Sequence, residues 1–264
     1  MNQLTRKLCL FLAMASISIH VSATTTIRLA YSDVESYPFQ MGDGADVANP
    51  PGLALDVLNQ VAKKLDLNIE YIRLPGKRVL QDIGAGKVDG GFIFSYNSQR
   101  AKYARYPTSD GKPDGSKRIA TIGYYFYTLD DKQLNWDGEN LADTDQKVGA
   151  HLGFSIVREL KKKQLKVHEV KTTEQLFNML QLDRLSAIAV QDTMAQQFLS
   201  SQKISNIKQV QPAITTKDYY LVLSHEFVDV NPELASKIWN AIEELRDDTF
   251  SNQGDKYLES HTHP

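Results

Sequence analysis

Cysteine is nearly absent from this sequence, which has one in 264 residues, Cys9. Cys9 lies inside an uncharged stretch, residues 8–19, that follows Arg6 and Lys7 and is succeeded by small residues. A positive start, a short apolar stretch and a small-residue site predict a signal peptide cleaved after Ala23. Cleavage would remove Cys9, so we expect an exported protein without disulfides, whose core is large enough to do without them.

The position and length of the same stretch disfavour a lipid anchor and a retained membrane anchor. A lipoprotein cysteine would follow the apolar stretch, whereas Cys9 lies at its start. An uncleaved helix would need about 20 apolar residues to span a bilayer. We therefore expect an unlipidated, water-soluble periplasmic protein that begins at Thr24.

Long apolar runs and long basic runs are also missing from residues 24–264. The first absence argues against an integral membrane protein, and the second makes nucleic acid a poor candidate partner. The formal charge changes from −2 to −4 when residues 1–23, which have two basic and no acidic residues, are removed. With 42% hydrophobic and 23% charged residues, the composition is that of an ordinary globular protein.

The first part of the chain alternates between predicted strands and helices. A strand is expected at residues 27–30, a second in "NIEYIRL" and a third, buried one at residues 88–94. Between the first two, "PPGLALDVLNQVAKKLDL" has apolar residues at helical spacing; these are Leu53, Val57, Leu58, Val61, Ala62 and Leu65. A short helix at the start of "PGKRVLQDIGAGKVDGGFIFS" separates the second strand from the third. This β-α-β-α-β order predicts an α/β domain with a mostly parallel sheet.

A second unit of the same kind begins at Lys147. The strands "KVGAH", "LKVHEV" and "SAIAV" alternate with helices in "GFSIVRELKKKQ" and "TTEQLFNMLQL", where Thr172 and Gln175 form an expected capping box. The last helix is expected to begin with Asn231 as N-cap and Pro232 at its first position. Its buried stripe would consist of Leu234, Ile238, Trp239, Ile242 and Leu245.

Two similar units with extended segments between them predict two α/β lobes joined by two hinge strands. Lobe 1 would comprise residues 24–120 and 220–264, and lobe 2 residues 121–219. The hinge strands are expected near residues 119–127 and 215–222. Each lobe would have its own sheet, so that one continuous sheet through both halves would contradict this prediction.

Polar residues follow several of the predicted strands. Ser95 lies at such an end in the first unit, and "HLGFS" and "QD" lie at equivalent ends in the second. In open parallel sheets, ligands bind outside the carboxyl ends of the strands. The three polar clusters would therefore meet where the two lobes face each other.

With these landmarks the sequence resembles the type II periplasmic solute-binding proteins of the family that captures amino acids for ABC importers. The resemblance covers residues 26–257 and depends on the order and spacing of "SYPF", "PGLALDVLNQVAKKL", "GKVDGGFIFS", "YNSQR", "KVGAHLGFS" and "RLSAIAVQDT". It implies the two-lobed fold, a small-molecule ligand in the cleft between the lobes, and an ABC permease as a partner. No cofactor or metal is implied, and we expect a monomer.

In that family a Ser or Thr at the end of the central strand of the first lobe precedes, by five residues, an Arg that binds the carboxylate of the ligand. Ser95 and Arg100 have this spacing. A guanidinium is always charged and binds a carboxylate through two parallel hydrogen bonds. The alternative is an ordinary surface arginine.

The resemblance also assigns "GFS" in the second lobe to the ligand. Gly153 and Ser155 match a Gly-x-Ser/Thr motif at a helix N-terminus, where free N–H groups favour a carboxylate. Ser155 would alternatively serve as an N-cap without a ligand. His151, two residues before Gly153, is a weaker candidate, since an isolated histidine is more often structural.

The aspartate expected to bind the ammonium of the ligand corresponds to Asp192. The usual "Gly-Arg-x-Asp-Ala" start of this segment is replaced here by residues 183–187, with one extra residue before the aspartate. The register therefore leaves Gln191 as the alternative, and a neutral Gln would weaken the case for an α-amino ligand. Asp192 would then be the N-cap of the next helix.

An aromatic wall completes the expected site. Tyr37 stands directly before Pro38 in "SYPF", and Tyr31 and Tyr96 are alternatives. Each would stack on a side chain or a cationic head of the ligand, or would be ordinary packing.

The resemblance favours a binding protein that closes on an amino acid or similar carboxylate by hinge motion, and not an enzyme. A periplasmic enzyme of the dehydratase kind on the same fold is the runner-up, because a fold does not determine function. Asp192 or His151 would be its acid or base, although no nucleophile–base pair stands out. A detached sensor protein is the third possibility.

Overall fold

The computed structural model describes residues 24–142 and 147–259; the predicted signal peptide lies outside them. Eight of its strands are hydrogen-bonded in the order β2-β1-β3-β10-β6-β9-β7-β8. In chain order, the elements are β1 (Thr25–Ser32), α2 (Leu53–Leu65), β2 (Leu67–Leu74), α3 (Gly76–Gly84), β3 (Gly90–Ser95), η1 (Arg100–Lys102), β4 (Thr108–Ser109), β5 (Lys112–Pro113), η2 (Gly115–Lys117), β6 (Ala120–Leu129), β7 (Val148–His151), α4 (Ser155–Lys162), β8 (Val167–Val170), α5 (Thr173–Gln181), β9 (Ala187–Gln191), α6 (Asp192–Ser201), β10 (Ile207–Leu223), α7 (His225–Val230), α8 (Pro232–Gln253) and α9 (Asp255–Glu259).

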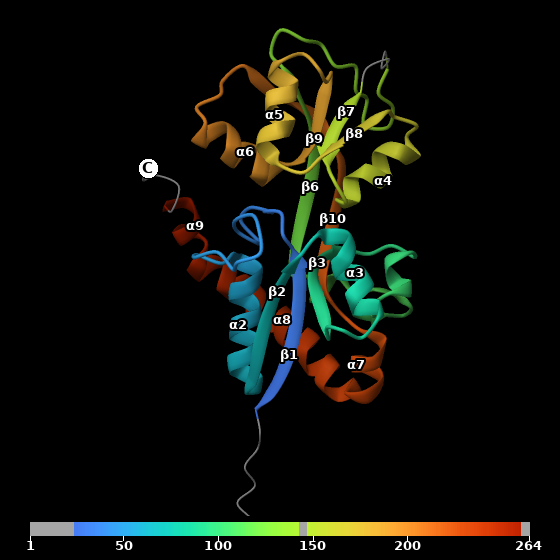
Figure 1. Cartoon of the computed structure of the whole chain (residues 1–264), viewed down its shortest axis with the longest axis vertical. Coiled ribbons are helices and arrows are strands. Elements are labelled where there is room, and N and C mark those ends of the chain that lie inside the picture. The colour runs from blue at the N-terminus through green and yellow to red at the C-terminus, as the bar shows by residue number, and fades with distance from the viewer. Residues whose placement is uncertain (1–23, 143–146, 260–264) are drawn as a thin grey trace, which may run out of the picture.

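Two groups of parallel strands form the two lobes (Figure 1). In the first lobe β1 pairs with β2 and β3, and helices α2, α3, α7 and α8 surround them. In the second lobe β7 pairs with β8 and β9, together with α4, α5 and α6. The predicted α/β two-lobed fold is present.

The long antiparallel strands β6 and β10 connect the lobes. β10 pairs with β3 at its carboxyl end, and β6 pairs with β9. The prediction of two separate sheets was therefore wrong in its strict form, because the hinge strands belong to both sheets and make the hydrogen bonding continuous. The predicted hinge at residues 215–222 lies on β10, and the one at residues 119–127 lies on β6 except for residue 119. The residue boundaries of the lobes stay a prediction.

Local sequence signals explain most of the elements. The apolar face predicted for α2 is buried except for the partly buried Leu65, and α2 packs against α8. Thr172 and Gln175 form the predicted capping box of α5. Asn231 is the N-cap of α8, with Pro232 at the first position, although the Asn231 side chain donates to Phe227 O instead of capping α8.

Three clusters of buried apolar residues hold the fold together. The largest runs through both lobes and includes Leu58 of α2, Tyr124 of β6 and Leu160 of α4. A second lies under α5 and α6, and a third under α3. Among the described residues, no helix has both the length and the apolar character needed to cross a membrane.

Candidate functional site

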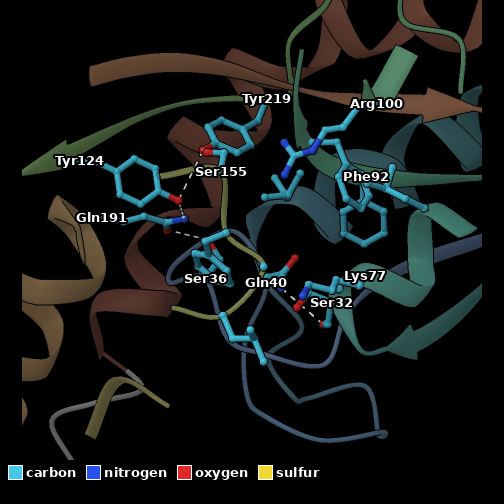
Figure 2. Close-up of a pocket in the computed structure, with 17 residues that line it drawn as sticks. Ser32, Ser36, Gln40, Lys77, Phe92, Arg100, Tyr124, Ser155, Gln191 and Tyr219 are labelled. Atoms are coloured by element: carbon cyan, nitrogen blue, oxygen red, sulfur yellow. Dashed lines mark hydrogen bonds between the residues drawn. The ribbon is translucent and has the colours of Figure 1, made fainter. Parts of the chain in front are cut away.

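A cavity of about 100 Å³ lies where the carboxyl ends of β1, β3, β7 and β9 meet the two hinge strands (Figure 2). This is the location at which parallel sheets bind ligands. Its lining comes from both lobes and from the hinge strands: Ser32, Ser36, Gln40, Gly76, Lys77, Leu80, Phe92, Ile93, Phe94, Arg100, Tyr124, Leu152, Gly153, Phe154, Ser155, Gln191 and Tyr219.

Arg100 lines the cavity and is held there by Ser95. One guanidinium nitrogen, Nη1, donates to Ser95 Oγ at 2.9 Å and to Ser95 O at 3.1 Å. Asn97 Oδ1 accepts from the backbone N–H of Arg100 at 2.9 Å, which fixes the turn after β3. Ser95 itself is buried and supports Arg100 without being part of the lining.

The guanidinium of Arg100 lies 5.5 Å from the ring centre of Phe94. Among the described residues, no carboxylate forms an ion pair with Arg100. Its Nε and Nη2 groups make no hydrogen bond to the described protein. A planar donor group that is positioned by neighbours and lacks an anionic partner is suited to bind a carboxylate from outside the protein.

Gly153 and Ser155 also line the cavity, from the second lobe. Gly153 has φ +80°, a left-handed conformation that favours glycine, and so allows the sharp turn from β7 into α4. Phe154, not Ser155, is the N-cap of α4, so the alternative of a serine cap was wrong. Ser155 Oγ is instead 2.7 Å from Tyr219 Oη.

A polar network crosses the floor of the cavity between the lobes. Ser36 Oγ donates to Gln191 Oε1 at 2.6 Å, and Gln191 Nε2 donates to Tyr124 Oη at 3.0 Å. Tyr219 Oη lies 3.4 Å from Tyr124 Oη and connects it with Ser155. Burial raises the pKa of Tyr124 well above its usual value, so this phenol stays protonated.

The structure places Gln191 in the cavity and Asp192 outside the lining. Gln191 pairs with Tyr124 across β9 and β6, which brings their side chains to the same face. The carboxylate of Asp192 lies near Gly123, where an added Cβ would be 3.6 Å from Asp192 Oδ2. Because Gly123 and Tyr124 are consecutive strand residues, that Cβ would point to the face opposite Tyr124. Asp192 begins α6, and its Oδ1 accepts from Thr193 N at 2.8 Å. The ammonium-binding role predicted for Asp192 therefore has no support in this geometry.

None of the three candidate tyrosines is among the described residues that line the cavity. Tyr37 is buried, and its hydroxyl donates to Tyr257 O at 3.2 Å. Tyr31 is buried behind the wall, with its ring stacked on Phe92 at 4.8 Å. Tyr96 is 42% exposed and packs edge-on against another tyrosine, Tyr106. The aromatic residues of the described lining are instead Phe92, Phe94, Tyr124, Phe154 and Tyr219.

His151 is also a structural residue and not part of the lining. Its Nε2 lies 3.1 Å from Thr173 Oγ1, and its ring stacks on Phe154 at 4.8 Å. Because the Thr173 hydroxyl donates to Met194 Sδ, its oxygen is available to accept from Nε2–H. Burial lowers the pKa of His151 to about 4, so the ring is neutral at pH 7.

A distortion in β3 shapes the wall. Ile93 has φ +59°, which is rare for a β-branched residue. The pairing of β10 with β3 shifts register between Tyr220 and Val222, as in a β-bulge. As a result, the consecutive residues Phe92, Ile93 and Phe94 all line the cavity, where a regular strand would present every second side chain.

Several lining residues were missed in the sequence. Tyr124 and Tyr219 lie on the predicted hinge strands, which must expose one face to the cleft between the lobes. Ser36 belongs to the "SYPF" segment, and Lys77 follows Gly76 at the start of α3, directly after the end of β2.

In the part of the chain that is described, no group of three or more His, Cys, Asp or Glu residues is placed to hold a metal ion.

Solved structures with the same fold include the ligand-binding core of GluR0 from Nostoc punctiforme in complex with L-glutamate (16% identity, TM-score 0.69, 88% of this chain and 98% of that chain). A substrate-binding protein of an amino acid ABC transporter has 20% identity and a TM-score of 0.63, with 90% and 99% covered. A histidine kinase sensor domain similar to periplasmic binding proteins has 13% identity and a TM-score of 0.68, with 90% and 96% covered. At these identities the likeness concerns the fold.

No curated protein matches the sequence. The model of one protein family matches residues 29–260, nearly the whole described chain and every element that contributes to the cavity. The chain therefore belongs to the bacterial extracellular solute-binding proteins, family 3.

Proposed function

We propose that this solute-binding protein captures an amino acid or a similar small carboxylate in the cavity between its lobes. The observation that supports this most directly is Arg100, whose guanidinium is oriented by Ser95 and has no anionic partner in the described protein. The N-terminus of α4 lies in the same lining, from the other lobe, at Ser155. Its free N–H groups and dipole favour negative charge.

The ligand carboxylate would accept hydrogen bonds from Arg100 and from the start of α4. The apolar part of the ligand would contact Phe92 and Phe154, which line the cavity from different lobes. A ligand held by both lobes favours their closed arrangement over an open one, because its contacts are complete only when the lobes are together.

Contacts between the lobes are already present beside the cavity. Besides the bond from Ser36 to Gln191, Thr193 Oγ1 donates to Tyr37 O at 2.8 Å. Lys171 Nζ lies 3.6 Å from Asp33. Because β6 and β10 are the hinge strands between the lobes, we propose that closure breaks and remakes these contacts. The corresponding division is lobe 1 at residues 24–120 and 220–264, and lobe 2 at residues 121–219.

The proposed function takes place after export of the protein. The family is extracellular, and we propose that residues 1–23 are a signal peptide removed after Ala23 without lipidation. The released protein would act as a monomer in the periplasm and deliver its ligand to an ABC permease.

A detached sensor protein is the second candidate, favoured by the likeness of the fold to a histidine kinase sensor domain. An enzyme of the dehydratase kind has less support. His151 is buried against Thr173 and Asp192 lies outside the lining, so neither is placed to act as an acid or base on a ligand in the cavity.

A thermal-shift screen of amino acids and small organic acids, each paired with its carboxamide, tests the proposed function. A ligand at a hundredfold excess over its Kd stabilises the folded protein by about 2.7 kcal/mol, which raises the Tm of a protein this size by roughly 5–10 °C. The carboxylate should raise the Tm and its carboxamide should not. Equal stabilisation by an acid and its amide would contradict binding through a carboxylate.

A further inference from the structure

The charged side chains that line the cavity are all cationic. Arg100 and Lys77 are the two charged residues of the lining, and no Asp or Glu is among the described residues that form it. Lys77 is exposed and makes no ion pair or hydrogen bond within the described protein. Lys77 belongs to the first lobe but reaches the second. Its Cγ lies 3.9 Å from the point where a Cβ added to Gly153 would be.

The position at which an acidic partner for an ammonium group was expected is occupied by Gln191. Both ends of the Gln191 amide are already bonded, to Ser36 and to Tyr124. Asp192 lies by Gly123 on the other face of β6. An ammonium group in this cavity would meet the positive charges of Arg100 and Lys77 and no carboxylate of the described lining, which is electrostatically unfavourable.

The cavity opens into a groove of about 300 Å³ that has the same electrostatic character. The two share six lining residues, Lys77, Leu80, Arg100, Gly153, Phe154 and Ser155. Arg158 and Lys161 add two cations to the groove, and its one carboxylate, Glu169, is 2.8 Å from Lys161. Arg158 Nε is buried without a hydrogen-bond partner within the described protein, while Nη2 of the same guanidinium lies 3.6 Å from Glu159 Oε1. A cleft in which cations outnumber carboxylates attracts anionic ligands.

We propose that the site selects small acids with two anionic groups and no ammonium group, with Arg100 binding one anionic group and Lys77 the other. This inference rests on the proposed function, because it specifies which kind of carboxylate the protein captures. It departs from an α-amino acid ligand on the basis of the residues in the cavity. Lys77, at the start of α3, is the specificity-determining residue.

Isothermal titration of matched acids tests this selection. Glutarate and 2-oxoglutarate each have the two carboxylates of L-glutamate without its ammonium group, and succinate corresponds in the same way to L-aspartate. Within each pair we expect the acid without the ammonium group to bind at least tenfold more tightly. Equal or tighter binding of the amino acids would overturn the inference and leave the proposed function standing. If none of these acids binds, this inference is wrong, and the proposed function is decided separately by the thermal-shift screen of other amino acids and carboxylates.

Charge-removal variants locate the second anion. Lys77→Gln should weaken glutarate binding at least tenfold and should weaken the binding of butyrate, a monocarboxylate, by a smaller factor. Lys102→Gln is the matched control, because Lys102 is exposed and lies outside the lining of both the cavity and the groove. Equal effects of the two variants on glutarate would overturn the role of Lys77.

Adding a negative charge to the cavity should alter the selectivity between acids with and without an ammonium group. Gln191→Glu places a carboxylate beside Ser36 and Tyr124, whose hydroxyls can donate to it. It should therefore improve the binding of L-glutamate relative to glutarate by at least tenfold. An unchanged ratio would mean that Gln191 does not face the ligand and would count against the proposed basis of selection.

Discussion

Ser36 and Gln191, 155 positions apart in the sequence, are joined by a buried hydrogen bond of 2.6 Å from Ser36 Oγ to Gln191 Oε1. Ser36 follows β1 of the first lobe, and Gln191 ends β9 of the second. The bond therefore connects the lobes directly beneath the cavity. It is the first bond of a network that runs from Ser36 and Gln191 through Tyr124 and Tyr219 to Ser155.

Ser36→Ala should weaken closure of the lobes. Leaving a buried amide oxygen without its donor costs about 1–3 kcal/mol, or roughly 5- to 150-fold in ligand affinity if the bond is present only in the closed form. Small-angle scattering of the ligand-free variant should also give a larger radius of gyration. Ser109→Ala, at an exposed serine, is the control, and identical affinity and scattering of both variants would rule out this role.

Arg100→Ala should leave folding nearly unchanged and weaken ligand binding strongly. Loss of a charge-assisted partner in a desolvated cleft costs on the order of 2–5 kcal/mol, roughly 30- to several-thousand-fold in affinity. Arg100→Lys should also bind more weakly, because an ammonium lacks the two-pronged geometry of the guanidinium. Calorimetry checks both variants against Arg105→Ala, a change at an exposed arginine outside the cavity lining. Wild-type affinity in Arg100→Ala would make Arg100 an ordinary surface residue.

Asp192→Asn should change ligand affinity less than about twofold, because the side chain lies outside the cavity lining. It should lower the free energy of unfolding by about 0.3–1 kcal/mol, since an acidic residue in the first turn of α6 stabilises the helix dipole. Calorimetry and urea denaturation measure the two effects. A selective loss of affinity for α-amino ligands would return Asp192 to the site.

His151 should make stability depend on pH. Its pKa of about 4 in the folded protein lies below the usual 6.5, so protonation favours the unfolded chain. The stabilisation is complete above pH 6.5 and is lost as the pH falls toward 4, by on the order of 3 kcal/mol. His151→Gln should lack this part of the pH dependence in urea denaturation between pH 7.5 and 4.5. If the free energy of unfolding depends on pH equally in both proteins, groups other than His151 cause that dependence.

Export can be tested without a ligand. We expect N-terminal sequencing of the protein released from the periplasm of its host to begin at Thr24, and mass spectrometry to find no lipid. A chain beginning at a modified Cys9, or one that keeps Met1, would refute the predicted processing.

Local sequence determined most of the secondary structure. The helical spacing of apolar residues defined the buried face of α2, and the Thr172–Gln175 pair defined the start of α5, because both signals depend on residues within one or two turns. The five-residue spacing of Ser95 and Arg100 is likewise local. Their hydrogen bond follows from the turn directly after β3.

The tertiary structure decided which of two adjacent residues lines the cavity. Gln191 and Asp192 stand at the junction of a strand and a helix, where neighbouring side chains diverge. Only the pairing of Gln191 with Tyr124 on β6 determined that the Gln191 side chain points to the cavity and the Asp192 side chain away from it. The inward turn of three consecutive β3 residues depends in the same way on the register shift against β10.

The sequence by itself thus determined the alternation of elements, the family pattern and the pairing of Ser95 with Arg100, since these depend on spacing along the chain. Only the tertiary structure brought Lys77, Tyr124 and Tyr219 into one cavity with Arg100. Their separations in sequence contain no signal of proximity. The charge balance of the cavity, on which the proposed ligand selection rests, exists only after strands far apart in the chain have paired.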